Sequence, residues 1–144
     1  MVGELALQAS TLKVGDAVDQ VVVDGLTRTQ LVMYAGASCD FNPLHTDEVY
    51  ATQAAGFPSV FGHGMLTMAL TGKAVTNYVG DGRLRRFGGR FRDQVWPGDT
   101  LTTRLSVTEL RSDDGEPVAV LDVVTLNQHG ATVFTGSAEA TIDQ

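Results

Sequence analysis

Apolar and polar residues alternate one by one over much of the C-terminal half of the chain. The alternation runs over residues 101–108 and again over residues 133–142. A period of two is typical of β-strands that bury one face. Turn residues separate the predicted strands, and they lie at 97–99, 112–117 and 129–130. With one more strand near Val21 to Val23, the pattern predicts a largely antiparallel sheet built mainly from four C-terminal strands.

A longer apolar segment, from Gly64 to Val79, has a different pattern. Its apolar residues lie on nearly every face of a helix, which is typical of a helix that is buried all round. Small residues in the last predicted strand, Gly136, Ala138 and Ala140, would let a helix and a sheet approach closely. The sequence therefore predicts an α+β fold in which an antiparallel sheet wraps around one long central helix.

Two shorter helices are predicted before the central one. Thr27 and Gln30 match a capping box, and the apolar spacing that follows predicts a helix over residues 28–37. Thr46 can cap the next helix, which has acidic residues in its first turn, where carboxylates favour the positive helix end. Gly and Pro at residues 56–58 are expected to end it.

Composition narrows the possible domain organisation, binding partners and location of the protein. The 144 residues suit one domain over residues 1–144, and no apolar run is long enough to cross a bilayer. A net charge of −7 argues against general binding to nucleic acid or acidic membranes. The start of the chain lacks the pattern of a secretory signal, and one cysteine cannot form an intrachain disulfide, so we expect a cytoplasmic protein. The exposed sheet edge predicts a dimer.

Candidate chemistry lies between the first two helices, in the segment GASCDFNPLH. Asp40 and His45 flank an Asn-Pro turn, so the carboxylate and the imidazole can face one side, hold a water and move its protons. Gly62-His63-Gly64 begins the central helix, where a free backbone N–H of Gly64 can stabilise an enolate oxygen. This set of groups suits addition of water to an activated alkene.

Other interpretations of these residues remain open. Asp40 can form an Asx turn, and His45 can bond only to backbone. Asp40, His45 and His63 could in principle bind iron or zinc, but their spacing matches no metal motif, so we expect no metal. Cys39 is interpreted as a small buried thiol. His129 is expected at the surface of a hairpin.

Five of the ten basic residues lie close together in GRLRRFGGRFR: Arg83, Arg85, Arg86, Arg90 and Arg92. In an acidic protein this cluster forms a local positive patch, suited to a small phosphorylated ligand or an acidic partner. Solvated arginines on an edge strand are the alternative interpretation.

The stretch YAGASCDFNPLHTDEVYATQAAGFPSVFGHGML resembles the motif of the MaoC-like, (R)-specific enoyl-CoA hydratase family. The motif combines an aromatic residue, Asp-x-Asn-Pro-aliphatic-His, a short helix, and His-Gly-Met at the head of the central helix. The chain is especially similar to small single-hot-dog dehydratase subunits of actinobacterial type, some of which act with a different partner subunit. The resemblance implies the hot-dog fold and pairing of two hot-dog subunits, as a homodimer or a heterodimer.

The resemblance also implies a function, the reversible hydration of trans-2-enoyl thioesters to (R)-3-hydroxyacyl thioesters. Asp40 and His45 would hold the water, the N–H of Gly64 would bind the thioester oxygen, and Asn42 and His63 would support the loop. No cofactor is expected, because coenzyme A or acyl carrier protein brings the acyl chain. Arg85, Arg86, Arg90 and Arg92 would meet the phosphates or acidic surface of that carrier.

Two other functions remain open, a hot-dog thioesterase and a subunit that is active only with its partner. The chain also departs from the family pattern at Cys39, where glycine is usual before the aspartate. If the backbone there needs a positive φ, cysteine would strain the loop. A hydroxyl residue that the family has further along the central helix lacks a secure counterpart, with Thr71 as the nearby candidate.

Overall fold

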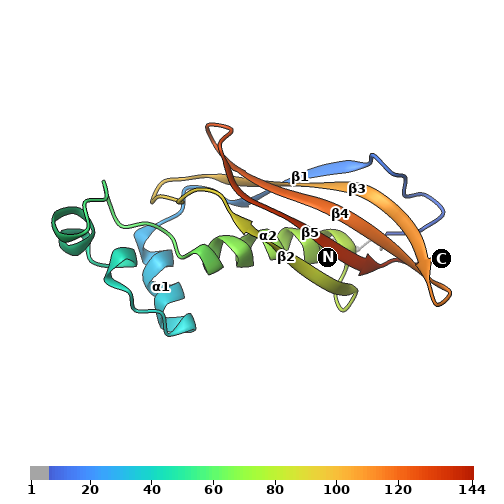
Figure 1. The fold of residues 1–144 in the computed structure, drawn as a ribbon, viewed down its shortest axis with the longest axis horizontal. Coiled ribbons are helices and arrows are strands. Elements are labelled where there is room, and N and C mark those ends of the chain that lie inside the picture. Colours follow the sequence, from blue (N-terminus) through green and yellow to red (C-terminus); the bar gives the residue numbers. More distant parts are fainter. Residues whose placement is uncertain (1–6) are drawn as a thin grey trace.

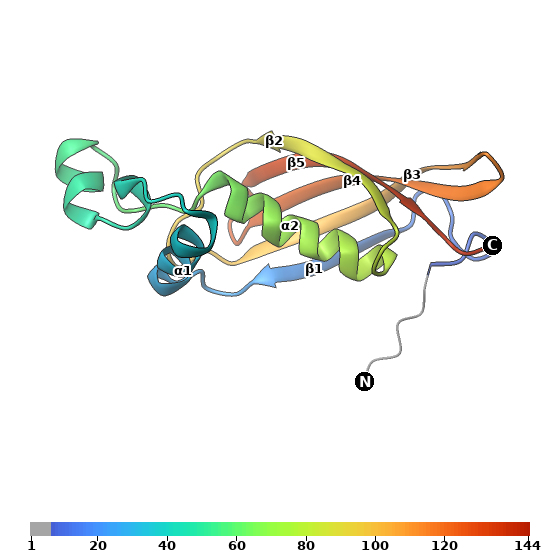
Figure 2. The same ribbon diagram turned by 90° about the horizontal axis from the view of Figure 1, so that it is seen from below.

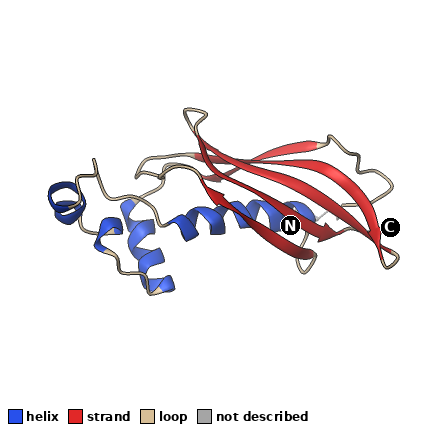
Figure 3. Ribbon diagram, in the orientation of Figure 1, coloured by secondary structure: helices blue, strands red, loops and turns tan. Residues whose placement is uncertain are grey.

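The computed structural model describes residues 7–144 and contains one five-stranded antiparallel sheet. The strands are β1 (Ala17–Val23), β2 (Leu84–Phe91), β3 (Leu101–Asp113), β4 (Glu116–Asn127) and β5 (Thr132–Thr141). They lie in the order β1-β3-β4-β5-β2 (Figure 2), and all neighbouring pairs are antiparallel. Figure 3 shows the strands in red and the helices in blue. The predicted sheet is confirmed, including its one strand from the N-terminal part.

The predicted alternation of buried and accessible positions is confirmed in β3, where Leu101, Leu105 and Val107 are buried. In β5, Ala138 and Ala140 are buried and face the helix cluster as expected. Gly136 has a different role from the predicted one. It pairs with Gly89 of the neighbouring strand β2, and a Cβ at Gly136 would collide with the β2 backbone. Small size is therefore needed there for strand pairing rather than for helix packing.

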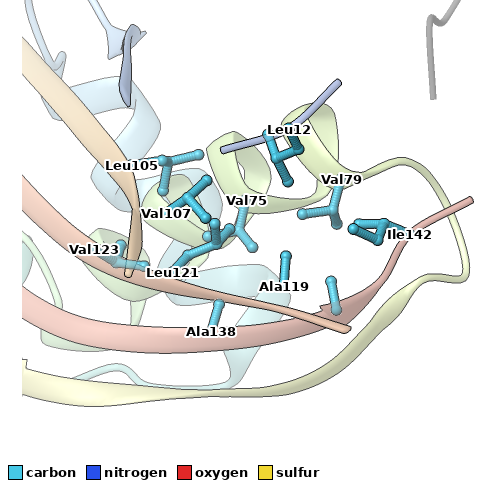
Figure 4. Packing of buried hydrophobic residues seen from close by; sticks show 11 residues of the cluster. Leu12, Val75, Val79, Leu105, Val107, Ala119, Leu121, Val123, Ala138 and Ile142 are labelled. Atoms are coloured by element: carbon cyan, nitrogen blue, oxygen red, sulfur yellow. The ribbon is translucent and has the colours of Figure 1, made fainter. Parts of the chain in front are cut away.

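The central helix α2 (Gly64–Val79) has the predicted bounds and lies along the inner face of the curved sheet (Figures 1 and 2). Val75 and Val79 of α2 pack against Leu105, Leu121 and other residues of β3, β4 and β5. Figure 4 shows this cluster. It holds the C-terminal half of α2 on the sheet, and burial of such side chains contributes about 2 kcal/mol each.

The prediction that α2 is buried all round is wrong for the single chain. One stripe of the helix is accessible, namely Met65, Ala69, Lys73 and Asn77. These positions recur every four residues and so lie on one face, away from the sheet. None of the helices within residues 7–144 is long and apolar enough to cross a membrane.

Three buried threonine hydroxyls connect α2 to the middle of the sheet. Thr71 of α2 lies 2.7 Å from Thr125 of β4, oxygen to oxygen, and Thr125 lies 2.8 Å from Thr103 of β3. All three residues are fully buried. A buried hydroxyl is costly unless it is hydrogen-bonded, and here each one has a partner in the chain of three.

A segment of short helices protrudes at one end of the sheet, beside the first turn of α2 (Figure 1). It comprises α1 (Arg28–Ser38), the 3₁₀ turn η1 (Pro43–His45) and the π-helical turn η2 (Tyr50–Ala54). The capping box of Thr27 and Gln30 at the start of α1 is confirmed. A second cluster, which includes Leu31, Ala51, Val60 and Val95, packs this segment onto the end of the sheet.

The second predicted helix is shorter than expected, and its cap is one residue later. Asp47, not Thr46, accepts the backbone N–H of Tyr50, at 3.0 Å, while Thr46 donates its own N–H to Pro43. Gly56 follows the turn with φ +75°, as a helix-ending glycine does. The carboxylate thus takes the capping role that the sequence pattern assigned to the neighbouring hydroxyl.

Candidate active site

The loop after α1 is held by a series of side-chain to backbone hydrogen bonds. The Asp40 carboxylate accepts the N–H of Asn42 at 3.3 Å, and the Asn42 side-chain oxygen accepts the N–H of Leu44 at 3.0 Å. The Asx turn therefore exists, and it does not remove the Asp40 carboxylate from solvent, because Asp40 is exposed. Both side chains fix the turn that leads into His45.

His45 is positioned by a backbone group that comes from the far side of the loop. Its Nδ1 lies 2.7 Å from the carbonyl oxygen of Phe61. Since a carbonyl oxygen only accepts, Nδ1 carries the hydrogen and Nε2 is left with a lone pair. This is the tautomer in which His45 can act as a base through Nε2.

His63 lies beneath His45 and connects it to the Asp40 loop. The two rings stack with centroids 3.7 Å apart and 25° between their planes. Nε2 of His63 lies 3.1 Å from the backbone carbonyl oxygen of Asp40, to which it donates. The rings of Tyr34 and His63 meet edge-on, with their centroids 4.9 Å apart. His63 therefore supports both the loop and the imidazole above it.

Burial lowers the pKa of His63, because the charged imidazolium loses its hydration. The positive charge that His45 can carry lowers the pKa further, while the hydrogen bond to the Asp40 backbone and the Asp40 charge raise it. The side chain is 2% exposed, and its Nδ1 has no hydrogen-bond partner in residues 7–144. His63 is thus a neutral imidazole with an unpaired, buried lone pair.

The structure brings Asp40, His45 and His63 together, with one oxygen or nitrogen atom from each lying within 4.8 Å of the others. Such a set invites a metal ion, but the ring geometry does not suit one. Imidazole lone pairs lie in the ring plane, and two stacked, nearly parallel rings direct them along separate planes. One ion cannot accept both lone pairs without breaking the stack.

Gly64 begins α2 next to a cavity of about 300 Å³. Its backbone N–H is one of those that have no acceptor within a helix, and the helix end adds partial positive charge. A Cβ at Gly64 would lie 3.2–3.3 Å from the ring of Phe91. Absence of a side chain therefore leaves room beside this amide. The cavity is also lined by Gly62, Thr67, Arg92 and Gln94.

The predicted patch of arginines is not a single surface. Arg83, Arg85 and Arg86 form ion pairs with Asp143, Glu116 and Glu139, respectively, at the end of β2 far from Gly64. Arg92 alone of the five borders the cavity at Gly64. It also lines a second cleft together with Arg90, and its Nε donates there to Thr135 at 2.8 Å. The arginines are therefore spread along the length of β2 and its ends, and they do not gather beside Gly64.

One further interpretation is wrong. Cys39 is exposed rather than buried, and it ends α1 with φ +57°. Thr71, the nearby candidate for the hydroxyl of the central helix, is buried and bonded to Thr125. His129 is exposed in the β4–β5 turn as predicted. Phe61 could not be identified from the sequence, because a backbone carbonyl that fixes a tautomer leaves no trace in the residue type.

An antiparallel sheet wrapped around one long helix, with a polar cluster at the head of that helix, defines a hot-dog protein. Comparison with solved structures agrees. The (R)-hydratase from A. caviae that is involved in PHA biosynthesis superposes with a TM-score of 0.79 at 30% identity, covering 92% of this chain and 98% of that one. The ChsH1-ChsH2 complex from Mycobacterium tuberculosis gives 0.75 at 25% identity, covering 92% and 99%.

The chain belongs to the MaoC like domain family, whose sequence model matches residues 9–128. It is 35% identical over 113 residues to the (R)-specific enoyl-CoA hydratase of Aeromonas caviae, covering 76% of this chain and 81% of that protein. It is 38% identical over 90 residues to 3-hydroxyacyl-thioester dehydratase Y of Mycobacterium tuberculosis, covering 60% of this chain. The chain spans 31% of the length of that dehydratase.

Proposed function

We propose that this protein catalyses the reversible hydration of trans-2-enoyl thioesters to (R)-3-hydroxyacyl thioesters. One observation carries the proposal, the convergence of the Asp40 carboxylate and the His45 ring beside the first amide of α2. A water can bond to both groups, since hydrogen bonds of about 2.8 Å to each span the separation of up to 4.8 Å. The (R)-specific hydratase among the relatives supports the reaction and its stereochemistry.

In this proposal the water oxygen bonds to C3 while His45 accepts one proton of the water through Nε2. The electrons of the C2–C3 double bond move toward the thioester carbonyl, and the N–H of Gly64 binds the enolate oxygen. Asp40 accepts a hydrogen bond from the same water and orients it. His45 then gives the proton that it took from the water to C2, which completes the hydroxyacyl product and restores the neutral imidazole. Asn42 and His63 hold these groups in place.

The test is turnover of trans-2-enoyl-CoA by the wild type and by Asp40→Asn and His45→Gln. Each substitution replaces a proton-handling side chain with one of similar size that cannot take up or release the proton, so kcat should fall about a hundredfold or more. His129→Gln is the matched control, because His129 is exposed in a distant turn, and it should keep wild-type turnover. Equal activity of all four proteins would refute the assignment of Asp40 and His45.

The same experiment separates hydration from thioester hydrolysis. With crotonyl-CoA, hydration removes the absorbance of the conjugated thioester and leaves the free thiol constant, whereas hydrolysis releases thiol. We expect loss of absorbance without thiol release. Release of thiol at the rate of absorbance loss would favour the thioesterase interpretation instead.

The proposal includes a carrier and a partner. Coenzyme A or acyl carrier protein would bring the acyl chain, with Arg92 as the arginine nearest to Gly64, and no cofactor would take part. Two hot-dog subunits would pair, as a homodimer or with a different subunit, and the similarity to the ChsH1-ChsH2 complex supports the second arrangement. The single cysteine is compatible with a cytoplasmic location.

A further inference from the structure

Asp99 is a buried carboxylate to which the proposed mechanism gives no role. It follows the turn at residues 97–98 and is only 6% exposed. One of its oxygens accepts the N–H of Trp96 at 2.8 Å, and the other accepts a side-chain N–H of Gln128 at 2.9 Å. None of the ion pairs within residues 7–144 includes Asp99. A buried charge without a counter-ion is costly, so its presence needs a reason.

The backbone already closes the turn that contains Asp99. The N–H of Asp99 donates to the carbonyl of Trp96 at 3.0 Å, and two further backbone hydrogen bonds join Gly98 and Asp99 to Leu26. A neutral asparagine at this position could accept the same N–H of Trp96. Closure of the turn therefore does not by itself require a charge.

The N–H of Trp96 belongs to a series of hydrogen bonds that ends at His45. This N–H shares a peptide group with the carbonyl of Val95, which accepts the N–H of Gly62 at 2.7 Å. The N–H of Gly62 in turn shares a peptide group with the carbonyl of Phe61, which accepts Nδ1–H of His45 at 2.7 Å. Two peptide groups thus connect the buried carboxylate to the imidazole.

Every hydrogen bond in this series donates in the same direction, from His45 toward Asp99. A carboxylate bonded to a peptide N–H increases the negative charge on the carbonyl oxygen of the same peptide, so that oxygen accepts the next N–H more strongly. From Asp99 to His45 the bonds measure 2.8, 2.7 and 2.7 Å, whereas N–H···O bonds in proteins are most often about 2.9–3.0 Å. Gly62 and Val95 are buried, so water does not compete for these bonds.

We propose that Asp99 is a positioning residue that holds and polarises His45 through the two intervening peptide groups. This inference rests on the proposed function, because it concerns the residue that accepts the proton of the water. The carboxylate makes the Phe61 carbonyl a strong acceptor, and that carbonyl keeps the hydrogen on Nδ1 of His45 and the lone pair on Nε2. Asp99 does not line the cavity at Gly64, so it acts only through His45.

The first test compares two carboxylates that lie close together in the fold. Asp99→Asn removes the charge and keeps an oxygen for the N–H of Trp96, so kcat for crotonyl-CoA should fall about tenfold while KM stays within about twofold. The loss is smaller than for His45→Gln because the base itself remains. Asp24→Asn is the matched control, since Asp24 is exposed, accepts the hydroxyl of Thr100 at 2.9 Å and lies outside the series. It should leave kcat and KM within about twofold.

The second test observes the hydrogen bonds by NMR and needs no turnover. The proton signals of the Trp96 and Gly62 amides and of Nδ1–H of His45 move downfield as their hydrogen bonds strengthen, and the ring nitrogen shifts of His45 report which nitrogen carries the hydrogen. In Asp99→Asn all three proton signals should move upfield, most at Trp96 and less at each later bond. In Asp24→Asn they should stay in place.

Gln128→Met keeps the proposal testable if Asp99→Asn does not fold. Gln128 is exposed, and its replacement frees the second oxygen of the carboxylate. More of the charge then acts on the N–H of Trp96, so the same three signals should move downfield.

Movement of the Trp96 signal alone, in either variant, would overturn the proposal and leave Asp99 as a residue that only closes a turn. Equal kcat in the wild type and Asp99→Asn, or an equal loss in Asp24→Asn, would overturn it as well, while hydration itself would stand. If no enoyl-CoA is turned over but all three signals move as expected, the connection from Asp99 to His45 stands and only the proposed hydration fails.

Discussion

At the scale of single residues, the backbone at Cys39 is the most informative departure from the family motif. The resemblance raised a conditional expectation, that cysteine would strain the loop if this position needs a positive φ. The position has φ +57°, in the left-handed region, where it ends α1 and turns the chain toward Asp40. A side chain with a Cβ is disfavoured there, and glycine is not.

Cys39→Gly should therefore stabilise the protein, by about 0.5–1 kcal/mol after allowance for the greater freedom of glycine in the unfolded chain. Ala37→Gly, two residues earlier in the same helix, should destabilise it by about 1 kcal/mol. Urea unfolding of both variants and the wild type measures the difference. Destabilisation by both substitutions would show that the left-handed conformation at Cys39 is not strained.

The buried imidazole of His63 should make stability depend on pH. Its pKa is lowered in the folded state from an ordinary value of 6.5, so below pH 6.5 the unfolded chain binds a proton that the folded one does not. Stability is then complete above pH 6.5 and falls as the pH decreases toward the folded pKa. Asp40, His45 and Tyr34 are the titratable neighbours that contribute to this environment.

Urea unfolding of the wild type at pH 7.5 and at pH 5 should show this loss, and His63→Gln should show a smaller one. The pKa values of Glu48 and Asp113 are lowered from 4.5 and 3.8, so protonation of these carboxylates reduces stability only at pH values below those. They therefore do not cause a loss of stability between pH 5 and 7.5. His129→Gln is the control for removal of an exposed histidine. An unchanged pH dependence in His63→Gln would contradict the assignment.

The convergence of Asp40 and His45 could be predicted from their spacing around a proline turn, but the groups that support them could not. The tautomer of His45 depends on the Phe61 carbonyl, and the environment of His63 depends on stacking between residues 18 positions apart. Cys39 was misjudged because a small apolar thiol is usually buried, whereas its position at a helix end leaves it exposed. These properties arise only when the chain has folded.

At the scale of elements, the first turn of α2 combines a helix end with a close approach by β2. Gly64 and Gly72 both lie on α2 and both face a phenylalanine of β2. A Cβ would come within 3.2 Å of Phe91 at Gly64 and within 3.1 Å of Phe87 at Gly72. The two positions are therefore alike in packing, and they differ in their distance from the candidate site.

Gly64→Ala should lower kcat about a hundredfold, because the new methyl group and a displaced Phe91 disturb the approach of the thioester oxygen to the amide. Gly72→Ala imposes similar crowding eight residues further along α2 and should leave kcat within about threefold. Steady-state kinetics with crotonyl-CoA measure both. A similar loss in the two variants would mean that crowding of β2, rather than the Gly64 amide, limits activity.

Long periodic elements were predictable, and short ones were less so. The alternation in β3 and β5 and the apolar run of α2 each involve many residues, so no single exception obscures them. The turn after η1 depends on one hydrogen bond, and a threonine and an aspartate next to each other are both good caps. Sequence pattern does not decide between them, and the structure selects Asp47.

At the scale of the whole molecule, the accessible stripe of α2 is uneven. Met65 and Ala69 lie at the end near the candidate site, and Lys73 and Asn77 lie at the other end. Met65 is 56% exposed, and Phe91 of the edge strand β2, whose ring packs near Gly64, is 49% exposed. Exposed apolar side chains next to an unpaired strand edge are the features that a second subunit would cover.

We expect the purified chain to have the mass of two 15.3 kDa chains in light scattering. Met65→Glu should shift it toward one chain, because a charge would be buried without a partner. Asn77→Glu, on the same stripe at its polar end, should not. A single-chain mass for the wild type would indicate that the partner is a different subunit, and a stable pair in Met65→Glu would place the interface elsewhere.

The three threonines in the core have a consequence for the accuracy of the site. Thr71 is seven residues after Gly64, about two helical turns, and it contacts a pair of hydroxyls that face each other across β3 and β4. Sliding or rotating α2 against the sheet would leave one buried hydroxyl without a hydrogen-bond partner, whereas apolar contacts alone would tolerate small shifts. The threonines thus fix the position of α2 along the sheet, and with it the position of the Gly64 amide at the start of the same helix.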